Sequence, residues 1–95
     1  MARLIWSPQA AADLEALCDY IARDSPEYAR IFAARVVALV EDIPAHPEAG
    51  RIVPEMERAE LRERLLGNYR IIYRLKHEAV EVVTILHGAR LLRET

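Results

Sequence analysis

One histidine and three arginines in the second half of the chain could together cleave RNA without a metal. His87 has a side chain that titrates near neutral pH, so it could act as the general acid or base. Arg62, Arg70 and Arg90 could hold a phosphate through paired hydrogen bonds and stabilise the charge of the transition state. The three glycines form no phosphate-binding loop, and no His or Cys spacing is typical of zinc. We therefore expect neither a cofactor nor a metal.

A predicted hairpin of two strands, residues 69–76 and 79–87, must position these side chains. With His77 and Glu78 as the turn, Arg74 lies opposite Glu81, which predicts a cross-strand ion pair. The same register puts His87 opposite Asn68, on the face that carries Arg70. One face then holds an apolar set that we expect in the core: Tyr69, Ile71, Tyr73, Leu75, Val80, Val82 and Leu86. The other face carries charge around apolar residues: Arg70, Arg74, Glu81 and His87 with Ile72, Val83 and Ile85.

The elements before this hairpin predict a helical layer. Residues 3–6 read as a short apolar strand, and Ser-Pro pairs at 7–8 and 25–26 predict the starts of two helices, about 8–23 and 26–43. Cys18 falls in the apolar stripe of the first helix and is expected to be a core thiol. Residues 46–58 read as a loop, and a further strand begins near Leu61. The order β-α-α-β-β-β predicts an α+β fold in which a helical hairpin covers one face of an antiparallel sheet.

Composition narrows the class of protein. A chain of 95 residues predicts one domain spanning residues 1–95. Its formal net charge of −2 argues against a general nucleic-acid binder, although basic residues, mostly arginines, outnumber acids over residues 51–95. The N-terminus does not resemble a signal peptide, and no apolar run approaches the ~18 residues of a membrane span. We therefore expect a soluble, cytoplasmic protein with no membrane partner.

Several motifs resemble the RelE/ParE superfamily of small bacterial toxins, and most closely its ParE branch. They are the entry Leu61-Arg62-Glu63, the strand Gly67-x-Tyr69-Arg70-Ile-Ile-Tyr73-Arg74, the exit His87-Gly88-Ala89-Arg90, and the upstream Trp6-Ser7-Pro8 and Pro47-x-x-Gly50-Arg51. They follow the family order over nearly the whole chain. The resemblance implies a RelE/ParE-like fold and a toxin of a type II toxin–antitoxin system.

The resemblance leaves three functions open. A ParE-like toxin would bind and poison DNA gyrase without catalysis, and its candidate target contacts are Arg62, Arg70, Arg74, Arg90 and Arg93. A RelE-like toxin would instead cleave mRNA on the ribosome with Arg70, His87 and Arg90. Ribonuclease members place lysines where this chain has Leu61 and Glu63, which favours the gyrase reading. A degenerate member would retain only antitoxin binding.

All three readings imply a cognate antitoxin in a hetero-oligomer. Apolar side chains on the charged face of the predicted hairpin, at Ile72, Val83 and Ile85, are the candidate antitoxin contacts. We expect a disordered antitoxin tail to fold onto them and to pair its acidic residues with the arginines. Nothing in the chain resembles a recognition helix, so promoter DNA would be bound only indirectly, through the antitoxin.

Overall fold

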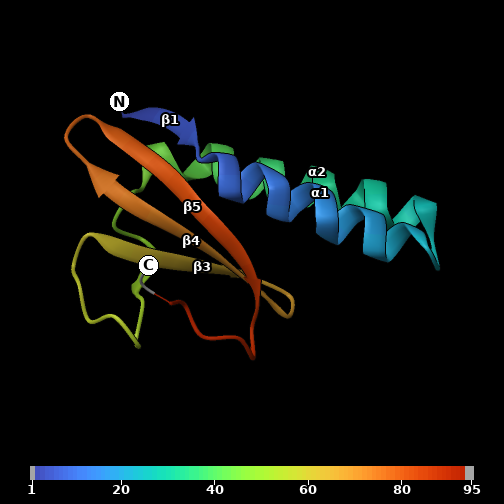
Figure 1. Cartoon of the computed structure of the whole chain (residues 1–95). Helices are drawn as coiled ribbons and strands as arrows, with labels where there is room; N and C mark the ends of the chain where they lie inside the picture. The colour runs from blue at the N-terminus through green and yellow to red at the C-terminus, as the bar shows by residue number, and fades with distance from the viewer. Residues whose placement is uncertain (1, 94–95) are drawn as a thin grey trace.

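The computed structural model describes residues 2–93, in which two helices pack against one five-stranded sheet (Figure 1). The helices are α1 (Pro8–Ala22) and α2 (Pro26–Asp42). The strands are β1 (Arg3–Trp6), β2 (Arg51–Ile52), β3 (Leu61–Leu66), β4 (Tyr69–Lys76) and β5 (Ala79–His87), in the sheet order β1-β5-β4-β3-β2. The predicted α+β fold is confirmed. The sheet is mixed, however, because β1 runs parallel to β5 while the other pairs are antiparallel.

Both helices begin where the Ser-Pro pairs predicted. The Ser7 hydroxyl accepts a hydrogen bond from the Ala10 N–H at 3.0 Å, and the Ser25 hydroxyl accepts one from the Tyr28 N–H at 3.1 Å. Each serine thereby satisfies an N–H that the first helical turn leaves unpaired. The break between the helices is short, so α1 and α2 form the predicted hairpin, which extends well beyond the sheet (Figure 1).

The main core lies between the helical hairpin and the sheet. Phe32, Val36 and Val40 of α2 are buried against Ile71 of β4 and Val82 of β5. Burying each such side chain contributes roughly 1.5–3 kcal/mol. Cys18 packs against this cluster as expected, and partial burial raises the pKa of its thiol. We call the side of the sheet that packs against the helices its helix face, and the opposite side its outer face.

A β-bulge in β5 corrects the predicted hairpin register. The pairs from Lys76–Ala79 to Tyr73–Val82 are as predicted, but Val83 is an extra residue, so Ile72 pairs with Thr84 rather than with Val83. Every later residue of β5 is displaced by one, and in a strand this moves each side chain to the other face. Ile85 consequently lies in the core on the helix face, where it is 3% exposed, whereas Leu86 moves to the outer face beside Ile72.

The bulge occurs where β5 loses its partner strand. Beyond Trp6, where β1 ends, the Ser7 N–H donates to the Val82 carbonyl and the Ser7 hydroxyl donates to the Val83 carbonyl at 2.8 Å. The Asp13 carboxylate of α1 then accepts hydrogen bonds from the Ile85 N–H, at 3.1 Å, and from the Thr84 hydroxyl. Ser7 and the start of α1 thus take the place that a longer β1 would occupy beside β5.

The segment between α2 and β3 is more ordered than the predicted loop. It contains a 3₁₀ turn, Ile43–Ala45, and the two-residue strand β2 at the sheet edge, which the sequence reading missed. Tyr73 anchors this segment, because its hydroxyl accepts from the Gly50 N–H at 3.0 Å and donates to the Pro47 carbonyl at 2.7 Å. Burial raises the pKa of the Tyr73 hydroxyl.

Across residues 2–93, the helices are too short or too polar to span a bilayer.

Candidate functional site

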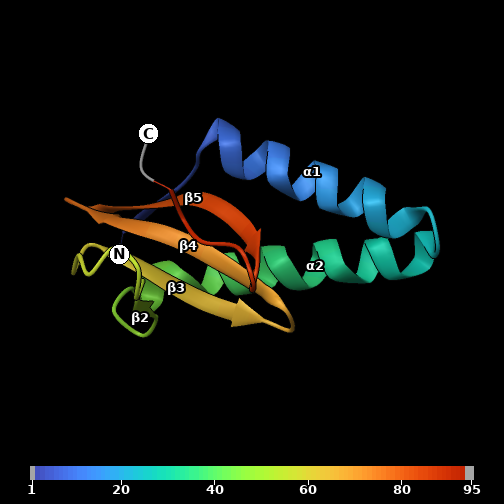
Figure 2. The ribbon, with the colours of Figure 1, turned by 60° about the horizontal axis from the view of Figure 1, so that its bottom comes forward.

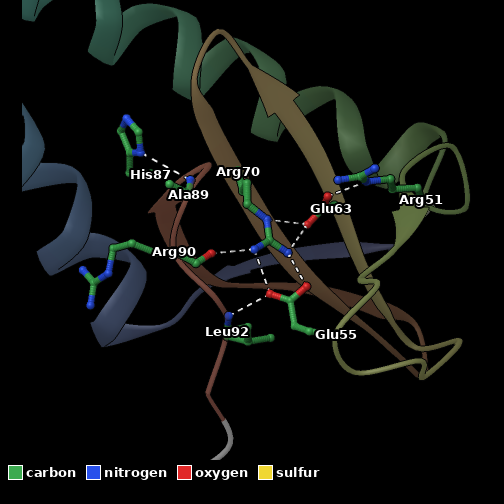
Figure 3. A network of polar contacts seen from close by, with 8 residues as sticks. All are labelled: Arg51, Glu55, Glu63, Arg70, His87, Ala89, Arg90 and Leu92. Carbon is green, nitrogen blue, oxygen red and sulfur yellow. Dashed lines mark hydrogen bonds and ion pairs between the residues drawn. The ribbon is translucent and has the colours of Figure 1, made fainter.

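A buried ion cluster occupies the outer face of the sheet (Figure 3). Arg70 of β4, only 5% exposed, donates from Nε to a Glu63 carboxylate oxygen of β3 at 2.8 Å. Its two terminal nitrogens also bond both oxygens of Glu55, at 2.7 and 2.8 Å. Arg51 approaches the other side of Glu63, with Nε 2.5 Å from the second carboxylate oxygen. The positive charge of Arg70 is therefore shared between two acidic side chains of the same chain.

The electrostatics of this cluster favour its ionised form. The hydrogen bonds from Arg70 lower the pKa of Glu55 to about 2, against an opposing effect of burial. The hydrogen bonds to Glu55 in turn raise the pKa of Arg70, so both groups stay charged at neutral pH. A buried pair of this kind has little capacity to bind a further anion, because a phosphate would have to displace carboxylates already in contact.

The C-terminal segment, residues 88–93, is attached to this cluster. Arg70 donates to the Arg90 carbonyl at 2.8 Å, and the Leu92 N–H donates to the Glu55 carboxylate at 2.8 Å (Figure 3). The Leu92 side chain packs against a small apolar cluster on the outer face that includes Val53 and Ile72. The segment thus turns back after β5 and lies over the outer face (Figure 2).

This covering limits the exposure of the predicted antitoxin contacts. Ile72 is fully buried beneath Val53 and the residues around it, and Ile85 lies in the helix-side core. Only Val83 of the three is partly exposed. The predicted outer face of mixed charge and apolar residues is therefore largely filled by the chain itself, which the sequence reading of the hairpin alone did not consider.

The five arginines proposed as target contacts fall into two groups. Arg62 points to the helix face and donates to backbone carbonyls, including those of Ala59 at 2.8 Å and Gly50 at 3.2 Å. Arg70 is held in the ion cluster described above. The other three, Arg74, Arg90 and Arg93, line one groove of about 980 Å³.

The groove lies between the start of α1, β5 and the C-terminal segment. We call it the basic groove, because three arginines and one acid line it beside apolar residues: Arg74, Arg90, Arg93, Glu81, Val83, Leu86 and Leu91. The predicted ion pair between Arg74 and Glu81 does not form, although the two residues are directly opposite. Glu81 instead contacts the Lys76 ammonium group at 3.1 Å. Arg74 is consequently left free to face the groove.

The residues of the predicted ribonuclease site are not brought together. Because of the bulge, His87 is opposite Tyr69 and faces the helix side, whereas Arg70 is on the outer face. The His87 ring lies edge-on to the Tyr69 ring, with 5.7 Å between centroids, and its Nδ1 accepts from the Ala89 N–H at 3.3 Å. Figure 3 shows the side chains of His87 and Arg90 directed away from the Arg70 guanidinium group.

Comparison with known proteins identifies the family. The family model described as "ParE toxin of type II toxin-antitoxin system, parDE" matches residues 4–92. The chain belongs to the ParE toxin family. This toxin is 37% identical over 92 residues to the protein named Toxin RelE2 of Caulobacter vibrioides, covering 96% of this chain and 100% of that protein. Its fold is similar to a solved structure described as the chromosomal ParDE TA system from P. aeruginosa, with a TM-score of 0.76 and 27% identity, over 92% of this chain and 96% of that one.

The sequence reading of the toxin missed the partners of Arg70. One signal was present. Glu63 is two residues after Leu61, so the two side chains point to the same face of the sheet, and Arg70 of β4 lies on that face as well. A buried acid beside an arginine on the next strand indicates an internal pair. No comparable signal marked Glu55, because it lies in an irregular segment outside the strands.

Proposed function

We propose that this toxin acts by binding and inhibiting DNA gyrase, and that a cognate antitoxin neutralises it in a hetero-oligomer. A type II toxin implies an antitoxin partner, and the ParE branch supplies gyrase as the proposed target. The toxin would encounter gyrase in the cytoplasm, and it would associate with promoter DNA only through the antitoxin.

The observation that carries this proposal is the sequestration of Arg70. Metal-free RNA cleavage needs an acid or base and a free cation close to one phosphate. Arg70 is neutralised by Glu55 and Glu63, and His87 lies on the other face of the sheet. An inhibitor that acts only by binding its target needs no such group of catalytic side chains. It needs accessible anchors, which Arg74, Arg90 and Arg93 supply.

The test is supercoiling of relaxed plasmid by purified gyrase with the purified toxin titrated in. We expect loss of supercoiling together with accumulation of cleaved plasmid. A triple variant, Arg74→Ala/Arg90→Ala/Arg93→Ala, should lose inhibition, and Arg35→Ala, which removes an exposed arginine of α2, should retain it. Complete supercoiling at an excess of toxin that still stops growth would exclude gyrase as the target.

The second candidate is a ribosome-dependent mRNA endonuclease. The name Toxin RelE2 of the Caulobacter relative favours it, as does the solvent exposure of His87. Cleavage of mRNA on ribosomes by the wild-type toxin, abolished in His87→Ala, would support this function. A toxin that neither inhibits gyrase nor cleaves mRNA nor slows growth would be a degenerate member that retains antitoxin binding alone.

A further inference from the structure

Lys76 is the single lysine of the chain, whose other 12 Lys and Arg residues are arginines. It ends β4 at the tip of the β4–β5 hairpin, beside the start of β1, and its side chain is 45% exposed on the outer face (Figure 1). An arginine side chain keeps its charge, whereas a lysine amine that loses a proton becomes a nucleophile. Lys76 is therefore the one Lys or Arg side chain whose positive charge acylation can remove.

A carboxylate already contacts this amine. The Lys76 nitrogen is 3.1 Å from a carboxylate oxygen of Glu81, whose side chain is 22% exposed. Lys76 pairs in register with Ala79, so the contact with Glu81 runs diagonally across the hairpin. A protonated amine cannot attack an acyl carbon, and a carboxylate at hydrogen-bond distance can accept the proton that the amine must lose.

Two arginines lie near the same acid on the outer face. Arg74 is directly opposite Glu81 and lines the basic groove, and Arg3 of β1 pairs in register with Ala79. Within residues 2–93, neither arginine side chain has a hydrogen-bond or ion-pair partner. A guanidinium group binds phosphate through paired hydrogen bonds. One end of the groove thus combines a nucleophile, a proton acceptor and a cation that can hold a phosphate.

We propose that Lys76 is an acylation site that reacts with a small acyl phosphate, and that its modification leaves Glu81 to pair with Arg74. The Lys76 nitrogen attacks the acyl carbon and forms an amide bond, while the bond between that carbon and the phosphate oxygen breaks. The phosphate leaves with the electron pair of that bond. The ammonium group gives up two protons, one through Glu81 to solvent and one to the leaving phosphate.

The modification would change the ion pairs at the groove. An acylated Lys76 is neutral and no longer holds Glu81, and the cation directly opposite that carboxylate is Arg74. One positive charge would be removed and a second would be neutralised. In the described part of the chain, the groove would then keep only Arg90 and Arg93 as arginines without an ion-pair partner. A weaker toxin follows from this change only on the proposed function, in which Arg74 contacts gyrase.

The first experiment incubates the purified full-length toxin with acetyl phosphate and locates acetyl groups by mass spectrometry of proteolytic peptides. We expect Lys76 to be acetylated at least about tenfold faster than free Nα-acetyl-lysine, because the proton acceptor and the cation are held beside it. Glu81→Gln should slow the reaction about tenfold if Glu81 accepts the proton. A carboxylate that served only as a counterion would keep the amine protonated, so its removal would speed the reaction instead.

Glu78→Gln is the matched control, since Glu78 is an exposed acid of the adjacent turn that lies near His77, and it should leave the rate unchanged. Acetylation confined to the N-terminal amine would overturn the proposal. So would a Lys76 rate equal to that of the free amino acid, or faster acetylation of Glu81→Gln, once the circular dichroism of the variant matches that of the wild type.

The second experiment tests the transfer of Glu81 to Arg74. Lys76→Gln imitates the neutral acylated side chain, and Lys76→Arg keeps the charge. Proton exchange at the Arg74 Nε–H, measured by NMR, should slow by about threefold or more in Lys76→Gln, because an ion-paired group is protected, and should stay unchanged in Lys76→Arg. Unchanged exchange in Lys76→Gln would overturn the transfer. Neither experiment uses gyrase, so a toxin that fails to inhibit gyrase in either form disproves the proposed target alone.

Discussion

Arg70 and Glu55 form a two-pronged ion pair between the middle of the sheet and the segment before β3, with the two nitrogen–oxygen distances at 2.7 and 2.8 Å. Glu55 also accepts from the Leu92 N–H, so a single carboxylate joins β4 to the C-terminal segment. The charge of Glu55 is therefore one of the contacts that hold residues 88–93, beside the bond from Arg70 to the Arg90 carbonyl and the packing of Leu92.

Replacing Glu55 with glutamine should loosen the C-terminal segment before it affects the rest of the fold. The variant keeps the shape of the side chain but removes its charge, while Glu63 still pairs with Arg70. We expect the free energy of unfolding to fall by about 2 kcal/mol. Hydrogen exchange at the Leu92 amide should become faster than in the wild type. The control Glu41→Gln, at an exposed position of α2, should change neither quantity.

Stability should also depend on pH through Glu55. Its folded-state pKa of about 2 lies below the ordinary value of 4.5, so the stability that Glu55 contributes is present above the unfolded-state pKa and is lost as pH falls toward the folded-state pKa. Urea unfolding measured between pH 5 and pH 2 should therefore show a loss of about 2–3 kcal/mol from this group. The Glu55→Gln variant should show a correspondingly flatter profile, and a profile as steep as that of the wild type would mean that other acids cause the loss.

Arg70→Ala should reduce toxicity by unfolding the protein rather than by removing a contact with the target. It leaves the fully buried carboxylate of Glu63 with only the exposed Arg51 as a partner, and breaking a buried pair typically costs about 3–5 kcal/mol. The comparison is Arg90→Ala, which removes an exposed side chain and should unfold at the wild-type temperature. Thermal unfolding of both variants beside growth inhibition separates the two causes. A stable but non-toxic Arg70→Ala variant would restore Arg70 as a direct contact.

His87→Ala distinguishes the two candidate targets. For a gyrase inhibitor, the exposed ring contributes one long hydrogen bond and one aromatic contact, so growth inhibition and the unfolding midpoint should stay at wild-type levels. For an endonuclease, loss of a general acid or base should reduce cleavage by about 10²–10⁴-fold. Growth curves after induction, with primer extension on cellular mRNA, measure growth inhibition and cleavage in one strain, and thermal unfolding of the purified variant gives the midpoint.

The helices could be predicted from local sequence patterns. The arrangement of the site depends on contacts between segments far apart in the chain, which those patterns do not encode. The Ser-Pro pairs and the apolar spacing gave both helices to within about a residue, because capping and amphipathicity are properties of neighbouring residues. The bulge at Val83 lies where Ser7 bonds to the Val83 carbonyl and Asp13 to the Ile85 N–H, contacts between residues 76 and 72 positions apart along the chain. The covering of Ile72 likewise comes from segments before β3 and after β5, and the hairpin sequence alone carried no sign of either.

The extra residue at Val83 bears on how relatives of this toxin are to be compared. It fixes the side of the sheet on which Leu86 and His87 emerge. In a homologue whose fifth strand runs without interruption, the residue aligned with His87 would emerge on the opposite side, beside the equivalent of Arg70. A histidine shared at this column therefore does not establish a shared role, and the strand geometry should be determined before activity is transferred from one member to another.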